Sequence, residues 1–202
     1  MAQLPPKLIV GLGNPGPEYS ETRHNAGFWF CERLAREWGL GFNRESRFHG
    51  LVASSRTEGV QLLMPQTFMN RSGQAVGALA RFYRIQPAEI LVVHDELDIP
   101  PGQLRLKFGG GAGAQRPQGH HRSLRNARLL AAAHRHWPSR RSQRGQNFVL
   151  KPPRREEQDL IDESIDRAVG AWSLIGRGEW NAATTRLNAR TTSAKPGNKK
   201  DA

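Results

Sequence analysis

The stretch that decides the fold is residues 8–30, LIVGLGNPGPEYSETRHNAGFWF. It begins with an apolar, β-branched run at residues 8–10, which is typical of a buried strand. Pro15 and Pro17 follow, and because proline fixes φ and lacks a backbone donor, a helix cannot begin directly after the strand. The chain therefore forms a loop at the carboxyl end of the strand, where open α/β sheets place their sites.

Polar side chains gather in this loop, ahead of a predicted helix over residues 25–38 that Gly39 ends. Apolar residues recur along that helix at helical spacing, so one of its faces packs on the core. His24 is therefore expected just before a helix N-terminus and close to Asn14. The polar residues of the loop are Asn14, Tyr19, Arg23, His24 and Asn25.

A dinucleotide-binding fingerprint is the alternative interpretation of this stretch. Gly11, Gly13 and Gly16 have the G-x-G-x-x-G spacing after a strand. The two prolines, however, fall where the phosphate-binding helix should begin, and no clean acidic residue closes a second strand about 20 residues further on. Both features disfavour a nicotinamide-dependent oxidoreductase.

The rest of the chain alternates strands with helices, which predicts an α/β fold: a single-domain sandwich with a twisted, mixed, centrally parallel sheet flanked by helices. A helix follows Asn70 or Ser72, either of which is a plausible N-cap. We expect one domain over residues 1–190 and a disordered basic tail over residues 191–202. Further strands are predicted at 48–54, 60–65, 90–93 and 104–108, and helices at 156–175 and 180–187.

Composition narrows the class of protein. The 202 residues carry a formal charge of +12, which points to a polyanionic partner such as nucleic acid. The single cysteine, Cys31, excludes a disulfide framework and a structural zinc cluster. We see no signal peptide and no apolar run of membrane-spanning length, so we expect a soluble cytoplasmic protein.

Four motifs together resemble the bacterial peptidyl-tRNA hydrolase family. They are GLGNPGPEY at 11–19, TRHNAG at 22–27, TFMNRSG at 67–73 and HDELDIPPG at 94–102, and they occur in the family's order and spacing. The resemblance covers residues 8–113 and 147–187. It implies hydrolysis of the ester between a peptide and the 3′-terminal ribose of tRNA, with no metal or organic cofactor. We expect the protein to be a monomer.

The resemblance also assigns roles in catalysis. His24 is the general base, since an imidazole accepts a proton at neutral pH. Asp95, just past the predicted strand at 90–93, holds the other ring nitrogen and sets the tautomer. Asn14 and Asn70 offer uncharged donors and acceptors that suit a peptide amide or an oxyanion. The alternative for Asp95 is a helix-capping or turn acid, and the alternative for both asparagines is that they only shape loops.

Four further residues are expected to bind the substrate. Tyr19 and Phe68 line the cleft and stack on the terminal adenine or pack on the peptide. Lys107 resembles the family's phosphate clamp, and Arg23 is a second candidate phosphate contact, with a solvated surface charge as the alternative for each.

Residues 114–146 do not fit the family. They contain eight arginines, four histidines and no acid. One possible set of codons for residues 114–121, AQRPQGHH, reads HNGLKDII in a shifted frame. A possible set for residues 129–141 reads FWRLRIGIGHPG in the same shifted frame. Both hidden sequences match the family. We therefore interpret residues 114–146 as an out-of-frame translation that begins near Gly113 and ends before Asn147.

This interpretation predicts that the chain as written folds poorly or forms an excursion, because Arg116 and Pro138 stand where the family has a substrate-facing asparagine and a buried strand. Three alternatives stay open: a genuine arginine-rich RNA-binding insertion, an inactive product of a frameshifted gene, and a non-catalytic RNA-binding relative of the splicing-factor type. Metal binding by His120–His121 or His134 and His136 lacks a defined partner ligand.

Overall fold

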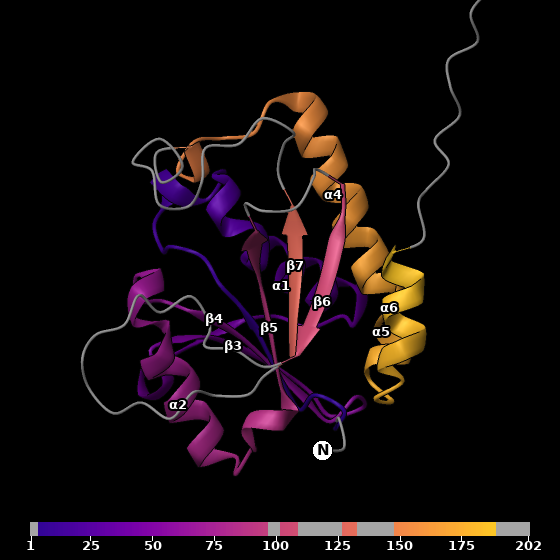
Figure 1. The fold of residues 1–202 in the computed structure, drawn as a ribbon. Coiled ribbons are helices and arrows are strands. Elements are labelled where there is room, and N and C mark those ends of the chain that lie inside the picture. The colour runs from indigo at the N-terminus through magenta and orange to yellow at the C-terminus, as the bar shows by residue number, and fades with distance from the viewer. Residues whose placement is uncertain (1–3, 97–101, 109–126, 133–147, 189–202) are drawn as a thin grey trace, which may run out of the picture.

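The computed structural model describes residues 4–96, 102–108, 127–132 and 148–188, and for residues 127–132 it describes the backbone alone. Within them, one seven-stranded sheet has the order β2-β3-β4-β1-β5-β7-β6 (Figure 1). The strands are β1 (Leu8–Gly11), β2 (Asn43–Glu45), β3 (Gly50–Ser55), β4 (Val60–Pro65), β5 (Ile90–Glu96), β6 (Leu104–Phe108) and β7 (Ala127–Ala132).

The centre of the sheet is parallel and its two sides are antiparallel. Strand β1 pairs in parallel with both β4 and β5, and β5 pairs in parallel with β7. The pairs β2–β3, β3–β4 and β6–β7 are antiparallel. The predicted fold class, a mixed and centrally parallel sheet flanked by helices, is therefore confirmed.

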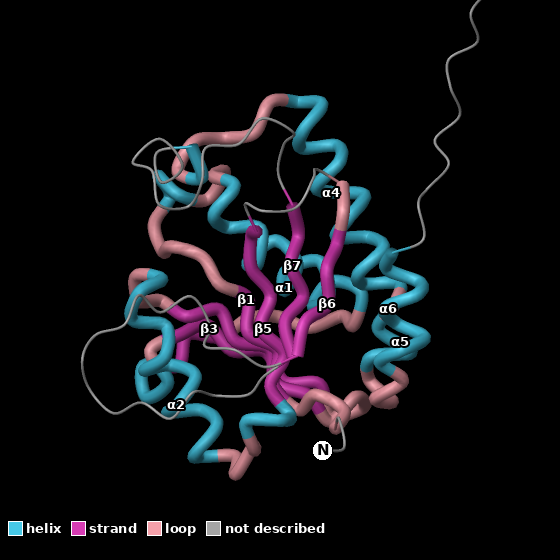
Figure 2. Tube along the Cα trace, viewed as in Figure 1, coloured by secondary structure: helices cyan, strands magenta, loops and turns pink. Residues whose placement is uncertain are grey.

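Helices cover both faces of the sheet (Figure 2). Alternate residues of β1 point to opposite sides, and each side joins its own apolar cluster: Ile9 packs with α1 and the carboxyl-terminal helices, whereas Leu8 and Val10 pack with α2. The helices are α1 (Ala26–Glu37), α2 (Ser72–Phe82), α4 (Arg155–Gly170), α5 (Trp172–Ile175) and α6 (Trp180–Asn188), with 3-10 turns η1 (Pro17–Tyr19), η2 (Arg23–Asn25), η3 (Ser46–Phe48), η4 (Met69–Arg71) and η5 (Pro87–Glu89).

Some predicted boundaries differ from the observed ones. The strand predicted at 48–54 begins later, because residues 46–48 form η3 and His49 adopts a left-handed φ of 50°. The helix predicted over 156–175 is divided at Ala171 into α4 and α5. Strand β2, at one side of the sheet, was not predicted, since its three residues are polar and mostly exposed.

Strand β7 lies within the stretch that sequence reasoning sets aside. The pattern of residues 114–146 predicts no strand, yet the backbone of residues 127–132 pairs with both β5 and β6. The rest of that stretch lies outside the described residues, as do the predicted tail at 191–202 and His120, His121, His134 and His136.

The carboxyl ends of β1 and β5 meet the first turn of α1 at very short range. A Cβ atom placed on Gly27 would lie 2.4 Å from the carbonyl oxygen of Val93 and 2.5 Å from the backbone of Leu12. A Cβ placed on Gly11 would lie 2.2 Å from the carbonyl oxygen of Gly27. The backbones can approach this closely only because neither glycine has a side chain. This approach fixes where η2, directly ahead of α1, meets the sheet.

We expect Gly27→Ala to destabilise the protein by roughly 1–3 kcal/mol, because the methyl group overlaps backbone atoms that cannot move aside. Denaturant unfolding of the two proteins measures the difference. Gly73→Ala is the matched control, since nothing lies within 4 Å of a Cβ at that position in α2. The control should be neutral or more stable by up to about 1 kcal/mol. Equal stability of the two variants would contradict the close approach.

Candidate active site

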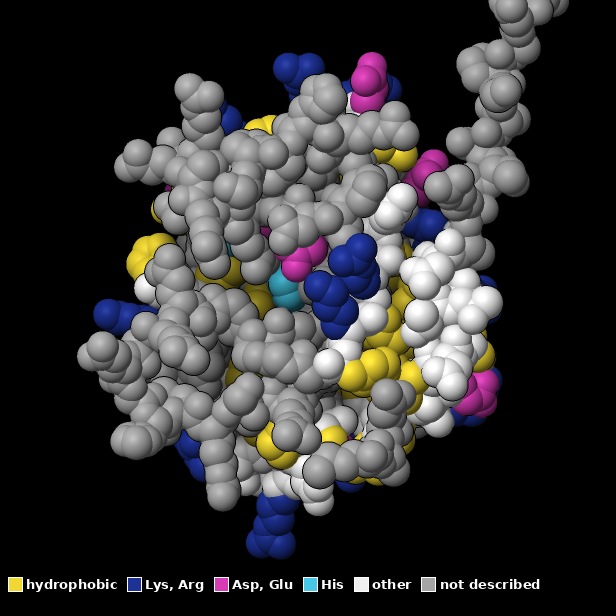
Figure 3. All heavy atoms as spheres, viewed as in Figure 1, with side chains coloured by type: hydrophobic (Ala, Val, Ile, Leu, Met, Phe, Trp, Pro, Cys, Tyr) yellow, Lys and Arg dark blue, Asp and Glu magenta, His cyan; other side chains and the backbone are white. Residues whose placement is uncertain are grey.

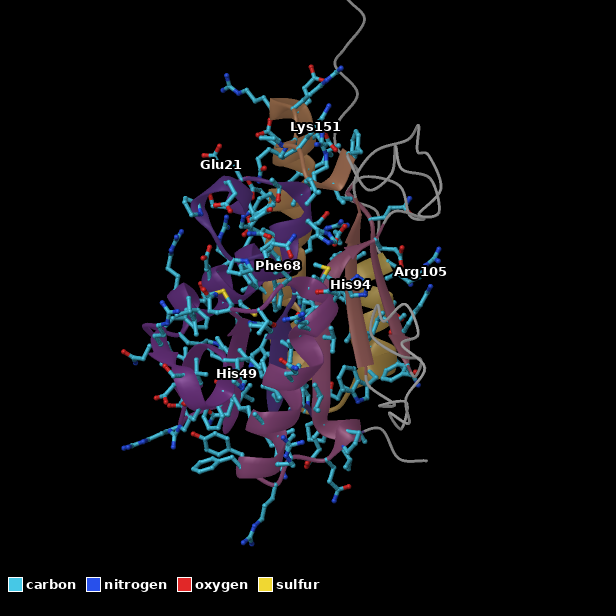
Figure 4. All side chains as sticks on the ribbon, turned by 90° about the vertical axis from the view of Figure 1, so that its left-hand side faces the viewer. Glu21, His49, Phe68, His94, Arg105 and Lys151 are labelled. Atoms are coloured by element: carbon cyan, nitrogen blue, oxygen red, sulfur yellow. The ribbon has the colours of Figure 1, made fainter. Side chains whose placement is uncertain are left out.

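Parallel strands bring three loops to one edge of the sheet. Strands β1, β4 and β5 run in the same direction, so their carboxyl ends lie together. The loop after β1 carries Asn14, the segment after β4 carries Phe68 and Asn70, and Asp95 is the penultimate residue of β5. Figure 4 shows Phe68 and His94 at a similar level along the sheet, from two of these three segments.

The central contact of this edge joins His24 to Asp95. Nδ1 of His24, in η2, lies 2.9 Å from Oδ1 of Asp95. The Asp95 side chain is 7% exposed and that of His24 is 22% exposed, so the carboxylate is enclosed while the ring keeps access to solvent. No hydrogen bond from a described residue reaches Nε2 of His24. An imidazole held at Nδ1 by a buried carboxylate can accept a proton at Nε2.

Asp95 is itself part of a packed strand end. All seven residues of β5 are buried, including its three polar residues His94, Asp95 and Glu96. Nδ1 of His94 lies 2.5 Å from the carbonyl oxygen of Asp95. Burial in a central strand restricts the rotamers of Asp95, so the carboxylate is rigid when it meets the His24 ring.

Two asparagines lock the loop after β1. The side chain of Asn25 accepts a hydrogen bond from the backbone N–H of Asn14 (2.8 Å) and donates one to its carbonyl (3.0 Å). The backbone N–H of Met69 donates to Oδ1 of Asn14 over 3.1 Å. This contact fixes the orientation of the Asn14 amide, and its Nδ2 donor is bonded by none of the described residues. Asn14 therefore links the β1 loop to the segment after β4.

The other residues assigned to the substrate differ in exposure. Phe68 is 59% exposed and Asn70 is exposed, so both are accessible beside Met69 and Asn14. Tyr19 is half-buried in η1, and Lys107 is exposed on β6. Within the described part of the chain, neither Tyr19 nor Lys107 hydrogen-bonds to His24.

Figure 3 looks onto one face of the molecule. Near its centre, a histidine side chain lies next to an acidic side chain and a small group of Lys or Arg side chains, with hydrophobic side chains around them.

Arg23 is not exposed on the molecular surface. It is 4% exposed, and its guanidinium forms a two-point ion pair with Glu157 of α4. This burial contradicts the prediction that Arg23 contacts phosphate, and also the alternative of a solvated surface charge. Arginine is seldom buried without a partner, and here the partner is 134 residues away in the chain, where no local pattern connects the two.

Sequence reasoning also gave no role to Asn25 and Glu157. Asn25 lies in the TRHNAG motif between His24 and α1. Its position in the sequence does not distinguish an amide that hydrogen-bonds to another loop from a helix cap. Glu157 sits in the first turn of α4, where an acid is expected for the helix dipole whatever else it contacts.

No group of three or more metal-ligating side chains occurs among residues with described positions. Over the same residues, none of the helices combines the length and apolarity needed to cross a membrane.

The fold and this edge define an α/β protein with a histidine–carboxylate pair beside uncharged amides, and comparison with known proteins identifies the family. A model of the peptidyl-tRNA hydrolase family matches residues 8–196. The peptidyl-tRNA hydrolase of Azoarcus sp. (strain BH72) is 64% identical over 198 residues, covering 94% of this chain and 88% of that protein. That of Aromatoleum aromaticum is 63% identical, covering 96% of this chain and all of that protein.

Solved structures agree. The crystal structure of peptidyl-tRNA hydrolase from Acinetobacter baumannii superposes with a TM-score of 0.81 at 42% identity, covering 91% of this chain and 95% of that one. A complex of peptidyl-tRNA hydrolase with N-propanol superposes with a TM-score of 0.82 at 41% identity, covering 93% and 97%. The chain belongs to the peptidyl-tRNA hydrolase family.

Proposed function

We propose that the chain hydrolyses the ester between a peptide, or an N-blocked amino acid, and the 3′-terminal ribose of tRNA, and so recycles peptidyl-tRNA. Membership of the family supports this reaction. The single structural observation that carries it is the 2.9 Å contact between His24 and Asp95 at the carboxyl edge of the sheet. The product pair is a free peptide and a tRNA with a free ribose hydroxyl.

In the proposed mechanism, Nε2 of His24 takes a proton from a water molecule whose oxygen attacks the ester carbonyl carbon. Asp95 keeps the proton of the neutral ring on Nδ1 and stabilises the imidazolium as it forms. The tetrahedral intermediate then collapses, and the departing ribose oxygen takes the proton back from the ring. A covalent route through Cys31 is disfavoured, because burial raises the pKa of its thiol to about 12.

Asn14 and Asn70 supply the uncharged donors in this proposal. The Nδ2 atom of Asn14 is oriented by the bond that its Oδ1 accepts from Met69. A fixed amide donor stabilises a developing oxyanion without reorganising during the reaction. The same amides suit the peptide group of an N-blocked substrate, which a free aminoacyl-tRNA lacks.

The proposed tRNA contacts are Lys107 for a phosphate, and Tyr19 and Phe68 for the terminal adenine or the peptide. The exposure of Lys107 and Phe68 supports these assignments. Phosphate contacts make the affinity depend on salt, while base stacking depends little on sequence. We propose a cytoplasmic monomer without a metal or organic cofactor.

We also propose that residues 114–146 are an out-of-frame translation within one domain spanning residues 1–190, followed by a basic tail at 191–202. The support is that two separate pieces of the segment, 114–121 and 129–141, have possible codons that spell the family sequence in a shifted frame. Arginine-rich sequence without this origin has no reason to match the family twice.

Removing the proposed base should slow the reaction strongly. We expect His24→Ala to lower kcat for N-acetyl-aminoacyl-tRNA by about 10²–10⁴-fold, the usual contribution of general-base catalysis. Asp95→Asn should lower kcat by about 10²-fold or more, since the amide cannot stabilise the imidazolium. Release of the labelled N-acetyl-amino acid measures both.

His49→Asn is the matched control, because His49 is exposed at the left-handed residue after η3 and asparagine tolerates that conformation. It should retain full activity. A kcat for His24→Ala close to that of the unmodified chain contradicts the base assignment. A chain that binds tRNA but never hydrolyses the ester, even with its frame restored, belongs to the non-catalytic class.

A phosphate contact by Lys107 should be visible in the salt dependence of tRNA binding. We expect Lys107→Ala to reduce the slope of log K against log salt by about 0.7–0.9, the value for one phosphate. Arg56→Ala, which removes an exposed cation from the β3–β4 turn, should leave the slope unchanged. Filter binding at several salt concentrations provides the slopes, and equal slopes for the two variants exclude the contact.

The frame proposal predicts the nucleotide sequence. Codons 114–121 and 129–141 should read HNGLKDII and FWRLRIGIGHPG when displaced from the written frame. A chain with the frame restored should unfold at higher denaturant concentration and hydrolyse faster, because a buried apolar strand replaces charged residues. Codons incompatible with the hidden frame would establish a genuine arginine-rich insertion instead.

A further inference from the structure

Three consecutive residues of η2 are tied to three different parts of the molecule. Arg23 bonds to α4 and the segment before it, His24 to β5, and Asn25 to the loop after β1. The η2 turn has only three residues and no side-chain N-cap bond of its own. Its position therefore depends on these outside contacts.

Each of the three guanidinium nitrogens of Arg23 has a hydrogen-bond partner. Nε lies 2.7 Å from Oε1 of Glu157, and Nη2 lies 2.5 Å from Oε2. Nη1 donates to the carbonyl oxygens of Lys151 and Pro152, each over 2.8 Å, and more weakly to that of Phe148 over 3.3 Å. The Phe148 ring centroid lies 3.9 Å from Cζ. The backbone N–H of Arg23 also donates to Lys151.

Glu157 is equally well fixed. It is 4% exposed, and its Oε2 also accepts a hydrogen bond from the backbone N–H of Arg154 at the start of α4. The carboxylate therefore belongs to the helix terminus as well as to the ion pair. A planar guanidinium that matches a carboxylate at two points defines direction as well as distance.

This geometry constrains His24 directly. Arg23 and His24 share a peptide bond, and the chain at Asn25 is held from the other side by Asn14. A shift of Arg23 therefore turns the His24 backbone relative to Asp95, and catalytic geometry is sensitive to displacements of about 1 Å. Arg23 does not contact the His24–Asp95 pair through its side chain; its effect passes through the backbone.

We propose that Arg23 is a positioning residue for the general base, and that Glu157 and the carbonyls of residues 148, 151 and 152 form its socket. The inference rests on the proposed role of His24. It makes the segment that follows residue 147 part of the active-site framework, although none of its residues is assigned to the chemistry.

The test uses Arg23→Lys, which keeps the charge but loses the two-point fork, and Glu157→Gln, which keeps the shape but loses the charge. Kinetics are measured per folded molecule, with the folded fraction determined by circular dichroism. We expect kcat for N-acetyl-aminoacyl-tRNA to fall at least tenfold in each variant, with KM changed by less than about twofold. Loss of transition-state alignment alone gives this pattern.

The split between kcat and KM provides a second readout. A ring displaced from Asp95 lowers kcat per folded molecule while substrate binding, and with it KM, is retained. A simple loss of folded protein lowers only the apparent rate, in proportion to the folded fraction, and leaves kcat per folded molecule unchanged.

Arg33→Met is the matched control. Arg33 also pairs with an acid of α4, Asp166, but from the second half of α1, on the surface and away from η2. It should keep the kcat and the KM of the unmodified chain. An Arg33→Met variant that loses as much kcat as Arg23→Lys overturns the proposal, because the effect is then general to α1–α4 packing.

Different results would overturn the positioning role of Arg23 and the proposed base role of His24. Full kcat per folded molecule in Arg23→Lys or Glu157→Gln, together with a strongly reduced kcat in His24→Ala, overturns the positioning role alone. Full activity of His24→Ala overturns the assignment of the base. If Arg23→Lys does not fold, Glu157→Gln decides by the same criteria. If neither folds, Glu157→Asp, which keeps the charge but shortens the side chain that holds the Arg23 fork, decides by the same criteria.

Discussion

The rest of the structure depends on the close approach of α1 to the carboxyl ends of β1 and β5. Two glycines, Gly11 and Gly27, leave the space for it, since a Cβ on either would overlap backbone atoms at 2.2–2.4 Å. The approach places η2, at the start of α1, over the end of β5. Without it, the His24 ring and the Asp95 carboxylate could not meet at 2.9 Å. A packing constraint in the core thus sets the distance on which the proposed chemistry relies.

Around that contact the site is held from both sides. The Asn14–Asn25 amide pair attaches η2 to the β1 loop, and the Met69 N–H attaches the same loop to the segment after β4. Arg23 attaches η2 to α4 and the segment before it. A short 3-10 turn has few internal hydrogen bonds, so rigidity has to come from such neighbours. The proposed chemistry uses uncharged amides and one imidazole, and these groups depend on the surrounding contacts for their alignment.

Charge has two separate roles in the chain. The buried pair of Arg23 and Glu157 is internal, and removal of either partner leaves a desolvated charge. Lys107 is exposed instead, and its proposed role is to contact a phosphate of the substrate. The net charge of +12 does not distinguish these two roles. Eight of the arginines that contribute to it lie in residues 114–146. Strand β7 lies inside that segment and between β5 and β6, so the written sequence of residues 114–146 bears directly on the sheet beside Asp95.

The sequence by itself determined the central strand β1, the proline-containing loop after it, the fold class and the family, because those depend on local patterns and motifs. It also predicted that His24 and Asp95 belong together at the ends of their elements. Only the tertiary structure decided that Arg23 is buried, that Glu157 is its partner, that Asn25 locks Asn14, and that β7 lies between β5 and β6. Arginine near a site is usually exposed, and a pair 134 residues apart in the chain has no local signal. Such contacts arise when the packing of the sheet and helices brings distant segments together.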